Sequence, residues 1–239
     1  RLGRLDEALQ QFNTALNLSK EKDFYHNLIG NFYYRHRRDE MAAEHYQKAI
    51  EADPTKAVYH ENLALAHQGL QNWEAAEKAY LNGLQLNPDN PTTHNRLGIV
   101  YYSTGRNELA IKHYQKALEL ASDNAQMLIN LGLAYEKTQQ IAKAESVYRE
   151  ALQLEPDNPK FQFHVGEFLV LFGRQEEAFP YFEKTFTLNP ADEAVLNSFI
   201  KIAQNLPDKN RAINWLRQIQ AINGINAELV QQTMDTLRG

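Results

Sequence analysis

The sequence contains no cysteine, which excludes disulfides, thiolate metal ligands and cysteine nucleophiles. It also lacks any apolar run that approaches the roughly 20 residues needed to cross a bilayer, so we expect no direct insertion into a membrane. No secretory leader opens the given sequence. Together these features favour a reducing compartment and a cytoplasmic location.

Positive charge is also scarce, because 25 Lys and Arg residues face 30 Asp and Glu residues and the net charge is −5. Nucleic-acid binders need a concentrated basic surface, so nucleic acid is not an expected partner. Signature motifs of catalysis are missing as well: there is no phosphate-binding loop, no G-x-S-x-G elbow and no H-E-x-x-H helix. We therefore predict a protein that is not an enzyme, with no catalytic residues and no cofactor.

What the sequence does contain is a repeat with a period of 34 residues, which is best sought before any other motif. Alanine fills one column at Ala8, Ala42, Ala76, Ala110, Ala144, Ala178 and Ala212. An aromatic residue follows four positions later at Phe12, Tyr46, Tyr80, Tyr114, Tyr148 and Phe182, and the column fails at Leu216. Glycine recurs at Gly30, Gly98, Gly132 and Gly166, and proline at Pro54, Pro88, Pro156 and Pro190.

Each column has a physical reason to recur. A small residue is needed where two helices cross closely, and an aromatic residue four positions after the alanine lies on the same helical face. Proline cannot continue a helix and disfavours the α conformation in the preceding residue, so it separates one unit from the next. Apolar residues within each half follow the helical period. The pattern predicts two helices per repeat, with the aromatic ring filling the space between neighbouring repeats.

These columns resemble those of the tetratricopeptide-repeat (TPR) family over nearly the whole chain. The resemblance implies an all-α, right-handed superhelical solenoid of helix-turn-helix repeats. We expect one TPR domain over 1–239, with a half repeat at 1–22, full repeats at 23–56, 57–90, 91–124, 125–158 and 159–192, a degenerate repeat at 193–226 and a capping helix at 227–238. The sequence departs from the family in lacking its usual tryptophan early in each repeat, where His26, His60 and His94 stand.

The two ends of the predicted solenoid differ. Leu2, Gly3 and Arg4 read as a turn, so the first unit is expected to hold only its second helix, roughly residues 5–19. That half repeat would leave apolar residues partly exposed, which suggests further repeats or another domain upstream and allows self-association through the ends. Residues 227–238 are expected to form a capping helix with an apolar stripe on one face and polar residues on another, because a solenoid needs a cap with a polar outer face.

Histidine is the one potential metal ligand that recurs with the repeat. His26, His60 and His94 stand one repeat apart. Equivalent residues on successive repeats are separated by about 8–10 Å, whereas zinc ligands lie about 2 Å from a shared ion. We therefore predict no metal site and interpret these histidines as packed at repeat junctions.

In TPR proteins the first helix of each repeat lines a concave groove, and the resemblance places the peptide-binding residues there. The predicted set is Asn31, Tyr34, Asn62, Leu65, Arg96, Ile99, Tyr102, Ile129, Asn130, Leu133, Lys160, Phe163 and His164. Aliphatic and aromatic side chains would supply burial, and asparagines would pair with the backbone of an extended or helical segment. Alternatively, apolar members of the set partly pack against neighbouring helices.

We therefore predict a non-catalytic scaffold or adaptor that binds a peptide or protein segment. The main alternative is the substrate-recruiting region of a larger enzyme, since Asn62 and Asn130 match the groove asparagines of TPR regions in O-linked N-acetylglucosamine transferases. A chaperone-tail clamp is disfavoured: Asn31, Asn62 and Arg96 match that clamp, but Asn27 and Thr92 replace its two lysines, which removes most of the charge that attracts a carboxylate.

Overall fold

The computed structural model describes residues 2–238, with the side chains of residues 2–6 and 8 left out of the description. Over this range the chain is built from α-helices joined by turns, and it contains no strand. The helices are α1 (Leu2–Leu18), α2 (Lys22–Arg35), α3 (Asp39–Ala52), α4 (Ala57–Gly69), α5 (Trp73–Leu86), α6 (Pro91–Ser103), α7 (Asn107–Leu120), α8 (Ala125–Lys137), α9 (Ile141–Leu154), α10 (Pro159–Leu171), α11 (Gln175–Leu188), α12 (Glu193–Asn205), α13 (Lys209–Gln220) and α14 (Ala227–Arg238). None of these described helices is both long enough and apolar enough to span a membrane.

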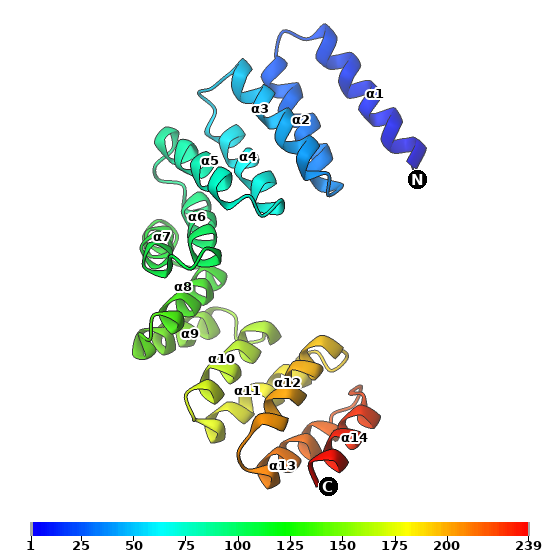
Figure 1. Ribbon diagram of the computed structural model, residues 1–239, viewed down its shortest axis with the longest axis vertical. Helices are drawn as coiled ribbons and strands as arrows, with labels where there is room; N and C mark the ends of the chain where they lie inside the picture. Colours follow the sequence, from blue (N-terminus) through cyan, green and yellow to red (C-terminus); the bar gives the residue numbers. More distant parts are fainter. Residues whose placement is uncertain (1, 239) are drawn as a thin grey trace. The chain divides into compact units, whose positions relative to one another are not determined.

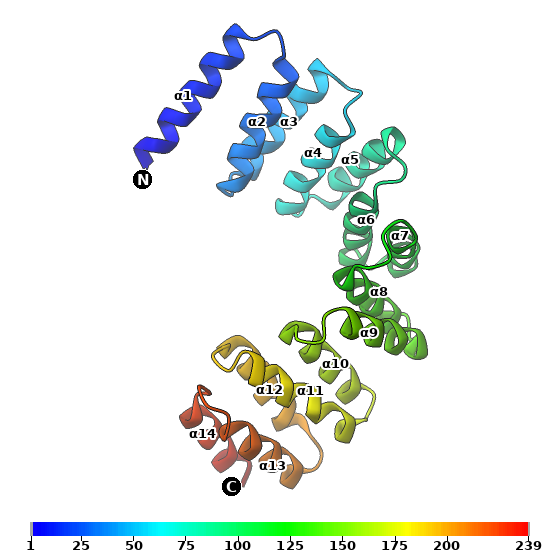
Figure 2. The same cartoon turned by 180° about the vertical axis from the view of Figure 1, so that it is seen from behind.

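The chain forms two compact units, one up to Ala144 and one from Glu145 onward. In the first unit, α2 packs on α3, α4 on α5 and α6 on α7, while α3 also packs on α4 and α5 on α6. Figures 1 and 2 show α2, α4 and α6 on the inner side of the arc that this unit makes, with α3, α5 and α7 on its outer side. The second unit pairs α10 with α11, α12 with α13 and α13 with α14.

Turns inside the repeats depend on one residue with positive φ. The five turns have this residue one repeat apart, at Arg37, Gln71, Gly105, Gln139 and Gly173, with φ between 56° and 75°. The next position in the series is Pro207, whose ring holds φ near −65°. There α12 ends instead on Leu206 in an extended conformation, which explains how the last repeat departs from the others.

Caps at the starts of the first helices also recur with the repeat. Side-chain oxygens of Asn90, Asn124, Asn158 and Asp192 each accept a hydrogen bond from a backbone N–H in the first turn of the following helix. An asparagine or aspartate at this position satisfies an amide that the helix itself leaves unpaired. The helix starts at Pro91 and Pro159 are therefore set by both a cap and a proline in the first turn.

The glycine and aromatic columns meet inside single repeats. A Cβ atom added to Gly98 would lie 2.5 Å from Cε1 of Tyr114, and one added to Gly30 would lie 2.6 Å from the Tyr46 ring. Close approach of the two helices therefore requires glycine at these positions. The sequence predicts that the aromatic ring fills the space between neighbouring repeats. The structure places it against the glycine of its own repeat, and Phe182 also packs against Phe199 of the next repeat, as Tyr148 does against Phe168.

The first helix also differs from the prediction at its start. Leu2, Gly3 and Arg4 were expected to form a turn, whereas α1 already begins at Leu2. A glycine inside a helix costs only about 1 kcal/mol relative to alanine, so Gly3 alone does not stop it. α1 packs against α2.

Candidate peptide-binding face

The first helices of the first unit hold most of the predicted groove residues. We define the inner face as the members of that set which keep part of their surface exposed on α2, α4, α6 and α8: Asn31, Tyr34, Asn62, Leu65, Arg96, Ile99, Tyr102, Asn130 and Leu133. Each is half-buried. Partly exposed side chains of mixed polarity on a row of helices can contact a bound segment while they keep their packing within the fold.

Three aliphatic residues form the apolar part of the inner face. Leu65 on α4, Ile99 on α6 and Leu133 on α8 occupy the same position of successive repeats. All three are half-buried, whereas Leu97 and Leu131, two residues earlier on α6 and α8, are 0% and 4% exposed. The row therefore lies at the boundary between the core and solvent, where its exposed fraction is available to a partner.

Asparagines link the first helices to one another. The Asn62 side-chain N–H donates to Oδ1 of Asn27 over 2.8 Å, and the Asn130 side-chain N–H donates to Oδ1 of Asn95 over 3.0 Å. The two pairs join α4 to α2 and α8 to α6. Each amide has two donors and an oxygen with two lone pairs, so every asparagine retains hydrogen-bonding capacity for a bound backbone.

Other polar residues of the inner face are partly used within the fold. The Tyr46 hydroxyl donates to Oδ1 of Asn31 over 2.8 Å. The Tyr80 hydroxyl donates to Oε1 of Gln68 over 2.9 Å, and burial raises the pKa of Tyr80 to about 12 against the opposing effect of the neighbouring Arg96. Asn31 therefore contacts the buried Tyr46 directly, and Arg96 lies close enough to the buried Tyr80 to act on its hydroxyl.

Two predicted groove residues are in the core instead. Ile129 is 1% exposed and Phe163 is 7% exposed. The Phe163 ring packs against Phe182 of the neighbouring helix α11, with ring centroids 5.4 Å apart. Both stand at the fifth position of their repeats, where Asn27 and Asn95 are polar, and an apolar side chain there is drawn into the core. Neither residue offers a surface to a partner in this structure.

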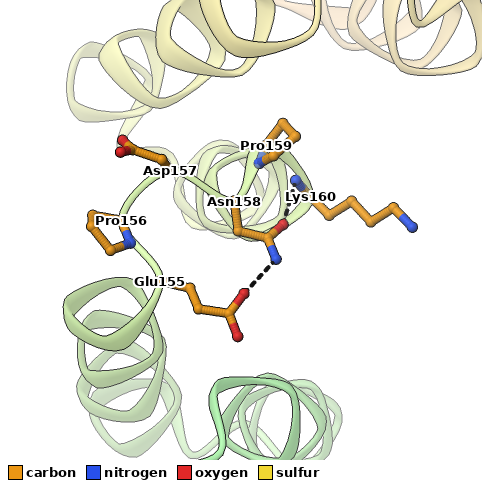
Figure 3. Close-up of a pocket in the computed structure, with 6 residues that line it drawn as sticks. All are labelled: Glu155, Pro156, Asp157, Asn158, Pro159 and Lys160. Atoms are coloured by element: carbon orange, nitrogen blue, oxygen red, sulfur yellow. Dashed lines mark hydrogen bonds between the residues drawn. The ribbon is translucent and has the colours of Figure 1, made fainter.

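The remaining two predicted residues lie in the second unit. Lys160 is exposed and His164 is half-buried, with its Nδ1 3.3 Å from Oε2 of Glu167. Lys160 borders a shallow depression lined by residues 155–160 (Figure 3). Asn158 spans it, donating to Glu155 and accepting from the Lys160 backbone N–H. These groups cap α10, which gives the depression a structural role.

Two pairs of histidines were not expected from the sequence. Nδ1 of His26 lies 3.2 Å from Nδ1 of His45, and Nδ1 of His94 lies 3.0 Å from Nδ1 of His113. Among the residues whose side chains are described, no group of three or more His, Asp or Glu is placed to hold a metal ion. The signal in the sequence is that two histidines stand 19 residues apart in two of the repeats. This spacing places one histidine on the first helix of a repeat and the other on its second helix.

The surroundings of His45 and His113 make protonation of both rings unfavourable. Burial, together with His26 and Lys48, lowers the pKa of His45 to about 4; burial, together with His94 and Lys112, lowers the pKa of His113 to about 4. The carboxylates of Glu44 and Glu77 act against these shifts more weakly. Both histidines are therefore neutral at pH 7.

We expect the free energy of unfolding to fall as the pH is lowered from 6.5 to about 4. In that window the unfolded chain binds protons at these histidines and the folded chain does not, so acid favours unfolding. The shift from the usual value of 6.5 corresponds to about 3 kcal/mol per ring. Solvent screening of these partly exposed rings reduces this to about 1–2 kcal/mol.

Urea denaturation at closely spaced pH values measures the effect. The double variant His45→Gln and His113→Gln is the control, since it keeps a polar side chain at both positions and removes the titration. Its stability should change less between pH 6.5 and 5 than that of the parent. Equal slopes for the two proteins would contradict the assignment.

Paired helices, recurring turns and glycine–aromatic contacts within repeats characterise both units of the chain. Over residues 1–195 the sequence matches the family described as the cilia and flagella-associated protein 70 C-terminal domain. The chain belongs to this TPR family. No curated protein matches the sequence.

The chain also resembles several solved structures. With MamA (residues 41 to the end) from Desulfovibrio magneticus it shares 21% identity and a TM-score of 0.67, covering 72% of this chain and 97% of the other. With YrrB, a TPR protein with an unusual peptide-binding site, it shares 19% identity and a TM-score of 0.63, and the match covers 78% of this chain and 96% of the other. With the C-terminal part of a TPR repeat-containing protein from Cytophaga hutchinsonii it shares 18% identity and a TM-score of 0.73, and the match covers 97% of this chain and 95% of the other. At these identities the likeness shows a shared fold, the all-α TPR solenoid.

Proposed function

We propose that this TPR domain is a non-catalytic scaffold and that its first unit binds a segment of another protein on the inner face. The observation that carries the proposal is the row of Leu65, Ile99 and Leu133, half-buried at equivalent positions of α4, α6 and α8. Apolar groups at the edge of the core gain further burial when a partner covers them. The peptide-binding site named for YrrB supports this use of the fold.

Polar residues would fix the orientation of the bound segment. Asn62 and Asn130 flank the aliphatic row and keep part of their hydrogen-bonding capacity after pairing with Asn27 and Asn95. They can pair with backbone N–H and C=O groups of the segment, which are present whatever its sequence. Arg96 adds a positive charge beside the row, so a segment carrying an acidic residue next to apolar ones suits the surface best.

Site-specific photocrosslinking tests this proposal. p-Benzoylphenylalanine is placed at Tyr102, a half-buried aromatic residue of the inner face, and in a control protein at Leu109, which is 41% exposed on α7. After irradiation in a lysate of the source cells, we expect a defined partner to be crosslinked from position 102 and not from position 109. Mass spectrometry then identifies the crosslinked segment.

Three outcomes would count against the proposal. Equal crosslinking from both positions would show that the contacts are not specific to the inner face. Crosslinks only to a second copy of this chain would indicate self-association. Crosslinks from position 109 alone would move the binding surface to the second helices.

A further inference from the structure

We propose that His94 and His113 form a two-histidine site for a divalent transition-metal ion, and that His26 and His45 form an equivalent site two repeats earlier. In each pair one ring comes from the first helix of a repeat and the other from its second helix. The facing atoms are both Nδ1, 3.0 Å apart in the later pair and 3.2 Å apart in the earlier one. The same arrangement of two histidines therefore occurs in two repeats.

The separation of the nitrogens suits a shared ion. Metal–nitrogen bonds to histidine are about 2.0–2.1 Å long, so two nitrogens bound to one ion lie about 2.9 Å apart at a right angle and about 3.3 Å apart at a tetrahedral angle. Both observed distances fall between these values. A shared ion therefore requires little change in the distance between the two nitrogens, and both rings turn so that their lone pairs point at the ion.

The hydrogen bond of His94 prepares its Nδ1 for metal binding. Its Nε2 lies 2.9 Å from the carbonyl oxygen of Pro88, which can only accept, so Nε2 carries the proton and Nδ1 presents its lone pair. Metal-binding histidines usually donate their second N–H to such a carbonyl or carboxylate. Without metal, His113 donates from Nδ1 to this lone pair; with metal, its proton moves to Nε2 through solvent and both neutral rings coordinate.

The surroundings set the expected strength and selectivity. An aromatic ring packs beside each pair: Tyr101 lies 5.3 Å from His113 and Tyr33 lies 5.5 Å from His45 between ring centroids. No third His, Asp or Glu of the described residues joins either pair, so water completes the coordination. Imidazole ligands favour Cu²⁺ over Ni²⁺, Zn²⁺ and Co²⁺, and Cu²⁺ should bind tightest.

Charged side chains lie near both sites. Lys22 and Lys48 both act against positive charge at the His26–His45 pair, with Glu44 and Glu51 opposing them. At the His94–His113 pair the acting charges are Lys112 and Glu77, and Glu77 is also paired with Arg106. These charges balance at the earlier pair, and Arg106 offsets Glu77 at the later one, so charge does not favour His94–His113. The hydrogen bond from His94 Nε2 to the Pro88 carbonyl, which leaves Nδ1 free to coordinate, is the feature that favours tighter binding there.

Titration of the whole chain with Cu²⁺, followed by electron paramagnetic resonance, tests the proposal. The expected stoichiometry is two ions with nitrogen coordination for the parent, one for His113→Gln, one for His45→Gln and none for the double variant. His164→Gln removes a histidine outside both pairs and should still bind two. Circular dichroism confirms that each variant is folded.

Thermal melting in Zn²⁺ provides a second readout, because an ion that binds only the folded chain raises its melting temperature. This rise should be absent in the double variant. No copper binding by the parent would overturn the proposal, as would a stoichiometry that His113→Gln and His45→Gln leave unchanged. Loss on His113→Gln alone would retain the later site and overturn the earlier one.

Discussion

Replacing Phe182 with alanine is expected to lower the free energy of unfolding of the second unit by about 3–5 kcal/mol. The ring is fully buried, and its centroid lies 5.4 Å from Phe163, 5.1 Å from Phe199 and 5.9 Å from Trp215. It also fills the space beside Gly166. Truncation would leave a cavity among four helices that cannot collapse without moving their backbones.

Denaturation followed by Trp215 fluorescence measures this loss. Trp73 lies in the first unit and is replaced by phenylalanine in all proteins, so that the signal reports the second unit alone. Repeat proteins need not unfold in a single step, which makes a local probe necessary. The control is Leu171→Ala, where the side chain is 63% exposed and little stability should be lost. Similar losses for the two variants would contradict the described core.

Most of the fold could be predicted from the sequence because the same residue types recur every 34 residues. The alanine column, the aromatic column and the prolines separate the helices without reference to tertiary contacts, and the helix starts at Pro91 and Pro159 fall where those signals place them. The turn residues were only partly visible. Gly105 and Gly173 indicate a left-handed conformation directly, but Gln71 and Gln139 adopt it because the turn requires it and not because glutamine prefers it.

The candidate site was harder to predict because it depends on which neighbour covers a side chain. Helical periodicity places Ile129 and Ile99 on related faces, yet Ile129 is buried and Ile99 is half-buried. Periodicity gives the direction in which a side chain points, but not how deeply the neighbouring helices bury it. Hydrogen bonds between repeats, such as Asn62 to Asn27, are equally invisible until the helices are packed.

The histidine pairs show the same limit in another form. Comparing His26 with His94 across repeats treats them as separate residues, but the partner of each histidine lies on the second helix of its own repeat. A search for equivalent positions therefore cannot find a pair made of two different positions. The Nδ1 contacts follow from the crossing of α2 with α3 and of α6 with α7.

The second large effect is expected at the inner face. We predict that Leu65→Asp, Ile99→Asp and Leu133→Asp together weaken binding of the partner segment by about 100-fold or more, equivalent to about 2.7 kcal/mol. Three carboxylates would lose water on contact with an apolar segment, and unpaired charges are costly to bury. The same changes remove the aliphatic surface that drives association.

A matched control carries the same three charges elsewhere in the first unit. Met41, Leu81 and Leu109 lie on α3, α5 and α7 and are 40%, 39% and 41% exposed. Changing all three to aspartate alters the net charge equally and leaves the inner face intact. Thermal melts of both triple variants establish that each is folded at the temperature of the binding assay.

The most direct test of the account is the dissociation constant of the crosslinked partner segment, made as a peptide, for the parent and the two triple variants by isothermal titration calorimetry. The account predicts parent-like affinity for the Met41, Leu81 and Leu109 variant and a loss of about 100-fold or more for the Leu65, Ile99 and Leu133 variant. Parent-like affinity in a folded Leu65, Ile99 and Leu133 variant would contradict binding at the inner face.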